Sequence, residues 1–156
     1  MEELRVQRFE TKRLRVERWT ATRAAAPLRA ILTPAVLAHL PPSLQEEDPE
    51  TWIIDRLEKS DVYAIEAEGA LIGVLILARS EAVHLGYLLA EDAWGRGYGS
   101  ELVQGLVAAL RAEAPVQLRA GVEVGNPASA RILQKAGFRP VHCDAPDTEL
   151  YALSLT

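Results

Sequence analysis

The stretch Trp94-Gly95-Arg96-Gly97-Tyr98-Gly99-Ser100-Glu101 places three alternating glycines between a predicted strand and a predicted helix. Residues 83–89 before it are largely apolar, and apolar residues recur at helical spacing from Leu102 to Leu110 after it. A loop with few side chains that leads into a helix exposes backbone N–H groups, and the helix dipole adds partial positive charge at that end. The stretch therefore predicts a binding site for a phosphate or pyrophosphate group.

The glycine spacing distinguishes this loop from two other phosphate loops. A P-loop needs Lys followed by Ser or Thr after its last glycine, whereas Ser100-Glu101 follows here. A dinucleotide-binding loop has the spacing G-x-G-x-x-G, whereas the glycines here follow G-x-G-x-G. The segment alone leaves open the alternative of a tight turn in which the glycines only permit positive φ.

A second segment, residues 122–138, reads Val-Glu-Val-Gly-Asn-Pro-Ala-Ser-Ala-Arg-Ile-Leu-Gln-Lys-Ala-Gly-Phe. Together the two segments resemble the GCN5-related N-acetyltransferase (GNAT) superfamily, with its Q/R-x-x-G-x-G/A pyrophosphate loop and its N-x-x-S-x-x-x-L-x-K-x-G-F helix. Residues 86–101, the opening Thr11-Lys12-Arg13-Leu14-Arg15-Val16 and the closing residues 147–153 resemble the RimJ/RimL group of ribosomal-protein N-terminal acetyltransferases within it. The resemblance spans nearly the whole chain.

The resemblance implies the α+β fold of the acyl-CoA N-acyltransferases, an α/β/α sandwich. A mixed, mostly antiparallel sheet is splayed around the coenzyme and flanked by helices. The residue pattern predicts strands near 14–19, 62–66, 70–78, 82–89, 115–124, 138–141 and 149–155. It predicts two short helices within 21–40 and longer ones over 48–59, 98–112 and 127–136. The length suits a single domain over residues 1–156.

Composition excludes several classes of protein. The net charge of −5 argues against non-specific nucleic-acid binding, and no apolar run reaches the roughly 20 residues of a membrane span. The single cysteine, Cys143, excludes an internal disulfide and fits a cytoplasmic protein. Cys143 and His142 have no third ligand nearby, so no metal site is predicted. The resemblance allows a homodimer, although no interface signature is visible.

The resemblance implies acetyl-CoA as co-substrate, held where the strand before the glycine loop diverges from the strand before Asn126. It assigns coenzyme binding to Leu88, Leu89, Ala90, Arg96, Gly97, Tyr98, Gly99, Ser100, Asn126 and Ser129. The first three would pair with the pantetheine arm, and the backbone of 96–100 would hold the pyrophosphate. Other readings stay open: a solvated Arg96, a helix-capping Asn126, and a Ser129 bonded to its own backbone.

The implied chemistry is direct attack of an amine on the thioester, in which Ser129 contacts or protonates the leaving sulfur. Many superfamily members carry a tyrosine acid where this chain has Leu133. Glu123, on the strand leading to Asn126, is the candidate base, with a solvent-facing charge as the alternative. His84 and a chain of water molecules are further candidates, whereas Glu101 suits a structural role in the first helical turn.

The acceptor is predicted to be a primary amine. An α-amine with a pKa of ~7.7–8.0 needs about 1 pKa unit of help at pH 7, and a lysine with a pKa of ~10.4 needs more than ~3. A protein or peptide N-terminus is therefore favoured. The acid-rich residues 45–61 could attract a cation, or form an ordinary solvated face. The alternatives are a small amine (antibiotic, polyamine or amino acid derivative) and a non-catalytic coenzyme-A-binding domain.

Overall fold

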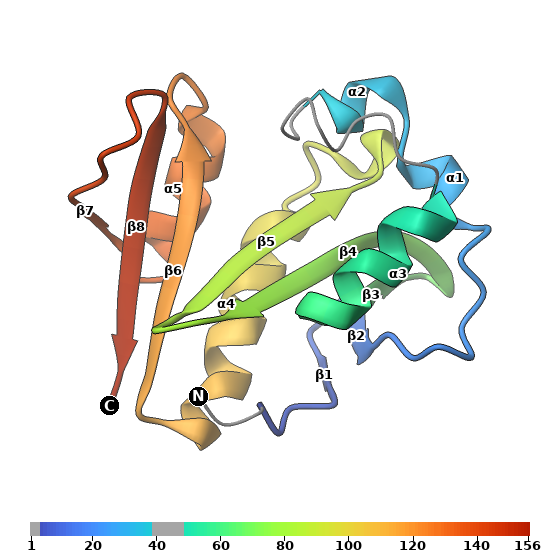
Figure 1. Cartoon of the computed structure of the whole chain (residues 1–156), viewed down its shortest axis with the longest axis horizontal. Helices are drawn as coiled ribbons and strands as arrows, with labels where there is room; N and C mark the ends of the chain where they lie inside the picture. The colour runs from blue at the N-terminus through green and yellow to red at the C-terminus, as the bar shows by residue number, and fades with distance from the viewer. Residues whose placement is uncertain (1–3, 39–48) are drawn as a thin grey trace.

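A computed structural model, which describes residues 4–38 and 49–156, contains one eight-stranded sheet in the order β1-β2-β3-β4-β5-β6-β8-β7 (Figure 1). The strands are β1 Arg8–Glu10, β2 Leu14–Arg18, β3 Asp61–Ala67, β4 Ala70–Arg79, β5 Val83–Leu89, β6 Val116–Glu123, β7 Arg139–Val141 and β8 Thr148–Leu155. The α-helices are α1 Leu28–Ile31, α2 Pro34–Leu37, α3 Pro49–Lys59, α4 Tyr98–Leu110 and α5 Pro127–Lys135, with 3-10 turns η2 Glu91–Ala93 and η3 Arg111–Glu113. The predicted mixed, mostly antiparallel sheet with flanking helices is confirmed.

The sheet separates two apolar cores because alternate residues of a strand point to opposite faces. In β3, Tyr63 and Ile65 belong to the core that the buried face of α4 completes. Their neighbours Val62 and Ala64 belong to the other core, together with Trp52 of α3. Figure 1 accordingly shows α3 and α4 on opposite faces of the sheet. No helix in residues 4–38 or 49–156 combines the length and the hydropathy needed to cross a bilayer.

The parallel pair β5–β6 separates along its length, which positions the site. Pairing is limited to Val83 with Leu118 and His84 with Arg119, at the beginning of β5. Beyond these residues β5 continues beside β4 as far as Leu89, whereas β6 stays paired with β8 as far as Glu123. The two strands therefore diverge toward their C-terminal ends, and a wedge opens between them (Figure 1).

Most predicted elements are present, and the main difference in the described residues is a short strand. The three-residue strand β1 was not predicted, because a short edge strand carries too few residues for an alternating pattern. Gly137 follows α5 with φ 102°, the left-handed conformation that glycine often adopts just beyond a helix C-terminus. Asp48, the first residue of the helix predicted over 48–59, lies outside the described residues, as do residues 39 and 40 at the end of the range predicted for the two short helices.

Candidate active site

The glycine-rich loop turns sharply into α4. Gly95 and Gly97 have φ values of 74° and 81°, a region that residues with a side chain rarely adopt. Gly97 is the N-cap of α4, and its carbonyl accepts the first helical hydrogen bond from the N–H of Glu101 at 3.1 Å. The N–H groups of the first turn therefore lack helical acceptors, which is the arrangement that binds anions.

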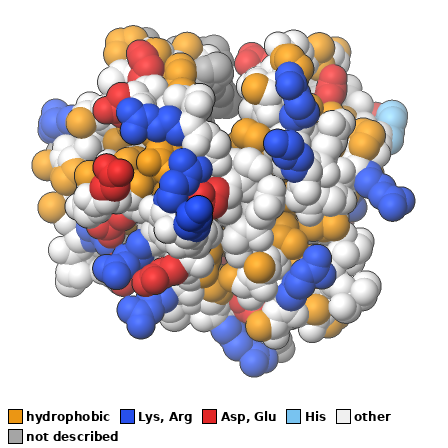
Figure 2. Space-filling model, turned by 180° about the vertical axis from the view of Figure 1, so that it is seen from behind, with side chains coloured by type: hydrophobic (Ala, Val, Ile, Leu, Met, Phe, Trp, Pro, Cys, Tyr) orange, Lys and Arg blue, Asp and Glu red, His pale blue; other side chains and the backbone are white. Residues whose placement is uncertain are grey.

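A cavity of about 880 Å³ fills the opening between β5 and β6, and we call it the wedge cavity. Its walls come from β5, the glycine loop, β6 and α5, and it reaches Trp52 and Arg56 of α3. Seen from the side of α4, the molecule has a hollow between its two halves, with Lys and Arg side chains on both edges (Figure 2). A long ligand can therefore extend from the glycine loop to α3.

The wedge cavity brings together most residues that the sequence predicted for the site. Those that line it are Leu88, Leu89, Gly97, Tyr98, Gly99, Ser100, Glu123, Asn126 and Ser129. Ala90 and Arg96 do not line it. The N–H of Ala90 donates to the carbonyl of Ile72 at 2.7 Å, and the carbonyl of Arg96 accepts from Arg13 Nη1 at 2.9 Å. Those two backbone groups are therefore already bonded within the protein.

The free edge of β5 faces the wedge. Because Ala90 donates its N–H to β4, the alternation of an antiparallel strand turns the backbone groups of Leu89 the other way, toward β6. The carbonyl of Leu89 accepts from Trp94 Nε1 at 2.9 Å. Trp94 itself lines the wedge cavity and is 42% exposed. The indole thus connects the end of β5 to the glycine loop, a contact that the sequence did not predict.

Asn126 and Ser129 lie at the start of α5. Asn126 Oδ1 accepts from the backbone N–H of Ser129 at 3.3 Å, so the predicted cap is present. Within the described residues, the side-chain NH₂ group of Asn126 and the hydroxyl of Ser129 make no hydrogen bond. The alternative of a Ser129 hydroxyl bonded to its own helix is therefore not what the structure contains. Both polar groups are free to meet a ligand in the wedge cavity.

The two candidate bases differ in position. Glu123, at the end of β6, lines the wedge cavity and is exposed to solvent. It is the one carboxylate among the described cavity-lining residues. His84 is also exposed, but it lies where β5 and β6 are still paired and does not line the cavity. The geometry thus retains Glu123 as a candidate and separates His84 from the site.

Tyr87 packs beneath the start of α4. A Cβ placed on Gly99 would lie 3.2 Å from Tyr87 Oη and 3.0 Å from Ile132 Cδ1, so the small residue lets α4 approach β5 and α5 closely. Burial raises the pKa of Tyr87 to about 12. The phenol is therefore protonated over the physiological range, and it can donate a hydrogen bond into the wedge cavity that it lines.

Four further cavity residues, Trp52, Arg56, Arg131 and Lys135, were not predicted from the sequence. Arg131 and Lys135 are four positions apart on α5, a spacing that places both cations on one face. Trp52 is 1% exposed, and its ring packs under the guanidinium of Arg56 at 5.2 Å. The spacing of Arg131 and Lys135 was visible in the sequence. The approach of α3 to β5 is a contact between distant segments, and no local sequence pattern indicates it.

Two acids of the acid-rich stretch 45–61, Asp55 and Asp61, form ion pairs with nearby cations. Asp55 binds Arg56 and, at 2.9 Å, Lys59. Asp61 is 5% exposed and lies between Arg18 at 2.8 Å and Arg79 at 2.9 Å. Neither carboxylate lines the wedge cavity. The acids at 46–48 and the side chain of Glu50 lie outside the part that the structure describes, and Glu58 is exposed. None of the described acids of the stretch lines the wedge cavity, so they do not support the predicted attraction of a cation.

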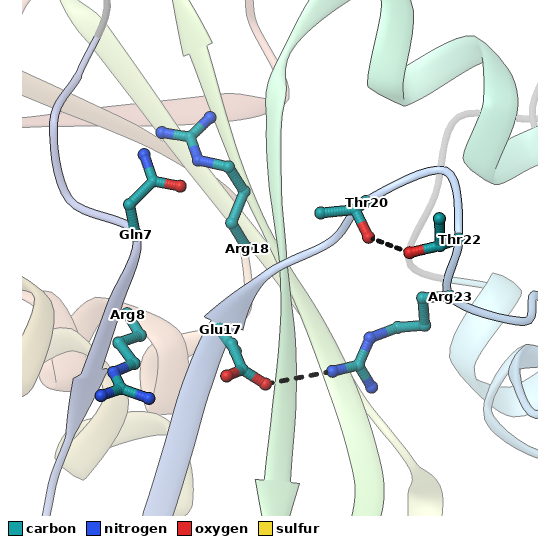
Figure 3. A pocket seen from close by; sticks show the side chains of 7 residues that line it. All are labelled: Gln7, Arg8, Glu17, Arg18, Thr20, Thr22 and Arg23. Carbon is teal, nitrogen blue, oxygen red and sulfur yellow. Dashed lines mark hydrogen bonds and ion pairs between the residues drawn. The ribbon is translucent and has the colours of Figure 1, made fainter.

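A second hollow of about 490 Å³ lies near the β1 edge of the sheet, lined by residues of β1, β2 and the segments next to them (Figure 3). Two pairs of its polar side chains bind each other. Arg23 pairs with Glu17 at 3.4 Å, and the hydroxyls of Thr20 and Thr22 are 2.8 Å apart. It contains neither glycine-loop residues nor helix N-termini from α4 or α5, and we assign it no ligand.

A sheet that opens beside a glycine-rich helix N-terminus offers a cavity with a site where a phosphate group can bind. The acetyltransferase (GNAT) domain family matches residues 13–139. The chain therefore belongs to the GNAT acetyltransferase family, and it is an acetyltransferase. The resemblance inferred from the glycine loop and the Asn126 segment is confirmed.

Solved GNAT structures share this fold at low sequence identity. RimL, the ribosomal L7/L12 α-N-protein acetyltransferase, in complex with coenzyme A has a TM-score of 0.78 at 19% identity, covering 95% of this chain and 98% of RimL. A GNAT acetyltransferase from Bacillus anthracis has a TM-score of 0.76 at 17% identity, covering 94% and 98% of the two chains. The microcin C7 self-immunity acetyltransferase MccE, bound to acetyl-CoA and AMP, has a TM-score of 0.74 at 13% identity, covering 92% and 93%. A search of curated proteins finds no match.

Proposed function

We propose that this acetyltransferase uses acetyl-CoA bound in the wedge cavity and acetylates the N-terminal α-amine of a protein or peptide. The observation that carries the coenzyme assignment is the free edge of β5 leading directly to the glycine loop at the start of α4. A pantetheine arm can add to that edge as an extended segment, and a pyrophosphate can bind the N–H groups of the first turn. RimL bound to coenzyme A and MccE bound to acetyl-CoA, which share this fold, support the proposed coenzyme.

The charges of the wedge cavity suit a polyanionic coenzyme. The cavity is lined by Arg56, Arg131 and Lys135 against the single described carboxylate of Glu123. Arg131 and Lys135 are exposed on α5, where they can reach phosphate groups with their long side chains. The apolar lining from Leu88, Leu89 and Ile132 suits the aliphatic parts of pantetheine.

In the proposed reaction the neutral amine attacks the thioester carbonyl of acetyl-CoA. The N–C bond forms, the C–S bond breaks, and coenzyme A leaves as a thiolate that takes up a proton. The Ser129 hydroxyl is the proposed donor to that sulfur. Glu123, directly or through water, accepts the proton that the amine loses.

The preference for an α-amine rests on the weakness of the available base. An exposed carboxylate such as Glu123 offers little help to a lysine, which must lose a proton more than ~3 pKa units above pH 7, whereas an α-amine needs about 1. The fold similarity to RimL, named as an α-N-protein acetyltransferase, supports the same acceptor class.

The test compares acceptors by the release of coenzyme A thiol. Peptides with a free N-terminus and no lysine are expected to be acetylated. N-terminally blocked peptides with an internal lysine, and spermidine as a small amine, are expected to react at least tenfold more slowly, consistent with about 1.4 kcal/mol of discrimination. Faster turnover of spermidine or of the blocked lysine peptides would contradict the proposed acceptor while leaving acetyl transfer itself intact.

A further inference from the structure

The turn between β1 and β2 contacts the outside of the glycine loop through Arg13. Arg13 Nε donates to Glu101 Oε1 at 2.7 Å, and Arg13 Nη1 donates to the carbonyl of Arg96 at 2.9 Å. The guanidinium carbon lies 4.4 Å from the centre of the Tyr98 ring, in a cation–π contact. One side chain thus holds the loop and the first turn of α4 together.

The carboxylate of Glu101 fixes Arg13 in this position. It also accepts from the Arg13 backbone N–H at 2.8 Å and from the Thr11 hydroxyl. Burial raises the pKa of Glu101, but the hydrogen bonds from Thr11 and Arg13 outweigh this effect and hold the pKa below its ordinary value. Glu101 is therefore ionised near neutral pH, and its charge holds the guanidinium over the loop.

The bond to the Arg96 carbonyl has a consequence for the next amide. In a trans peptide the C=O and the following N–H point in opposite directions. Arg13 lies outside the wedge cavity, whereas Gly97 lines it. Drawing the Arg96 carbonyl toward Arg13 therefore turns the Gly97 N–H away from Arg13 and toward the cavity. At Gly97 φ is 81°, a backbone conformation that glycine adopts readily, so the Arg96–Gly97 peptide can take this orientation.

We propose that Arg13 is a positioning residue for coenzyme binding: it fixes the Arg96–Gly97 peptide so that the Gly97 N–H faces the pyrophosphate. The inference rests on the proposed binding of acetyl-CoA in the wedge cavity. Arg13 does not touch the coenzyme in this account. It reduces the ordering that the loop must undergo when the phosphate binds, which raises affinity through preorganisation.

The experiment compares two acetyl donors, acetyl-CoA and S-acetylpantetheine, which lacks the pyrophosphate. Arg13→Ala is expected to raise the KM for acetyl-CoA by about tenfold, as for loss of a charge-assisted hydrogen bond at one peptide. Its kcat for acetyl-CoA and its kcat/KM for S-acetylpantetheine are expected to stay near wild-type values. A lysine at position 13 can still pair with Glu101, but it lacks the planar fork that also reaches the Arg96 carbonyl. Arg13→Lys is therefore expected to keep the raised KM for acetyl-CoA, while its melting temperature is closer to that of wild type than the melting temperature of Arg13→Ala.

The matched control is Arg15→Ala, because the Arg15 side chain is 61% exposed on β2 and pairs with the exposed Glu10 at 3.4 Å. It is expected to leave both donors unaffected. Equal losses with both donors in Arg13→Ala, or full recovery of the KM in Arg13→Lys, would assign Arg13 to general stability and overturn the proposal. If calorimetry shows that wild-type protein does not bind coenzyme A, the proposed function fails first, so the two failures are distinguishable.

Discussion

Asn126 Oδ1 accepts the backbone N–H of Ser129 at 3.3 Å, which couples two candidate ligand contacts at the start of α5. The cap uses only the oxygen of the Asn126 amide and only the backbone of Ser129. Both residues line the wedge cavity with a second polar group available. One local motif therefore begins the helix and directs two polar side-chain groups to the place where the thioester is proposed to bind.

Ser129→Ala is expected to lower kcat by about 100-fold, within the range for loss of a general acid. Affinity for acetyl-CoA is expected to stay within a few fold, because Ser129 is proposed to contact the thioester and not the phosphates. Steady-state kinetics and calorimetry on the same preparation measure both quantities. Ser154→Ala, which removes an exposed hydroxyl on β8, is the control. Unchanged turnover in Ser129→Ala would remove Ser129 from the proposed mechanism.

Ser100→Asp and Ser100→Asn test the phosphate site with side chains of nearly equal size. Ser100 lies in the first turn of α4 and lines the wedge cavity. An acid there is favourable to the helix by ~0.3–1 kcal/mol, so the aspartate variant should fold as well as wild type. It should bind coenzyme A at least ~30-fold more weakly than the asparagine variant, equivalent to about 2 kcal/mol of repulsion and lost contact. Equal affinity of the two variants would place the phosphates elsewhere.

Much of this architecture could be predicted from short stretches of the sequence. The glycine loop, the cap at Asn126 and the left-handed Gly137 are each encoded within a few residues. What escaped prediction depends on contacts between distant segments. Examples are Arg13 against Glu101, and Trp52 beside β5 in the wedge cavity. The structural role of Asp61 was not predicted either. In the sequence Asp61 looks like an ordinary surface acid, whereas in the structure it is buried and pairs with Arg18 and Arg79.

Asp61→Ala is expected to destabilise the fold by about 3–5 kcal/mol, because it leaves two partly buried guanidinium groups without their shared carboxylate. Asp55→Ala comes from the same acid-rich stretch but removes a surface carboxylate, and it should not measurably change stability. Urea unfolding of both variants measures the difference. Similar unfolding midpoints would contradict the structural role of Asp61.

Alkaline pH is expected to weaken the fold through two tyrosines. Burial raises the pKa of Tyr87 and of Tyr63 to about 12 each, above the ordinary value near 10. Between about pH 10 and pH 12 the unfolded chain loses these protons while the folded chain keeps them, so the free energy of unfolding falls as pH rises. Tyr87→Phe should reduce this slope, measured by urea unfolding at several pH values. An unchanged slope would mean that Tyr87 is not buried in solution.

The most direct test of the account is calorimetric titration of the wild-type protein with acetyl-CoA. The account predicts one site per chain with micromolar affinity, and weaker binding of S-acetylpantetheine because it lacks the phosphates that the glycine loop holds. No heat of binding up to millimolar acetyl-CoA would mean that the loop before α4 is only a turn, and it would contradict the coenzyme site on which the proposed function depends.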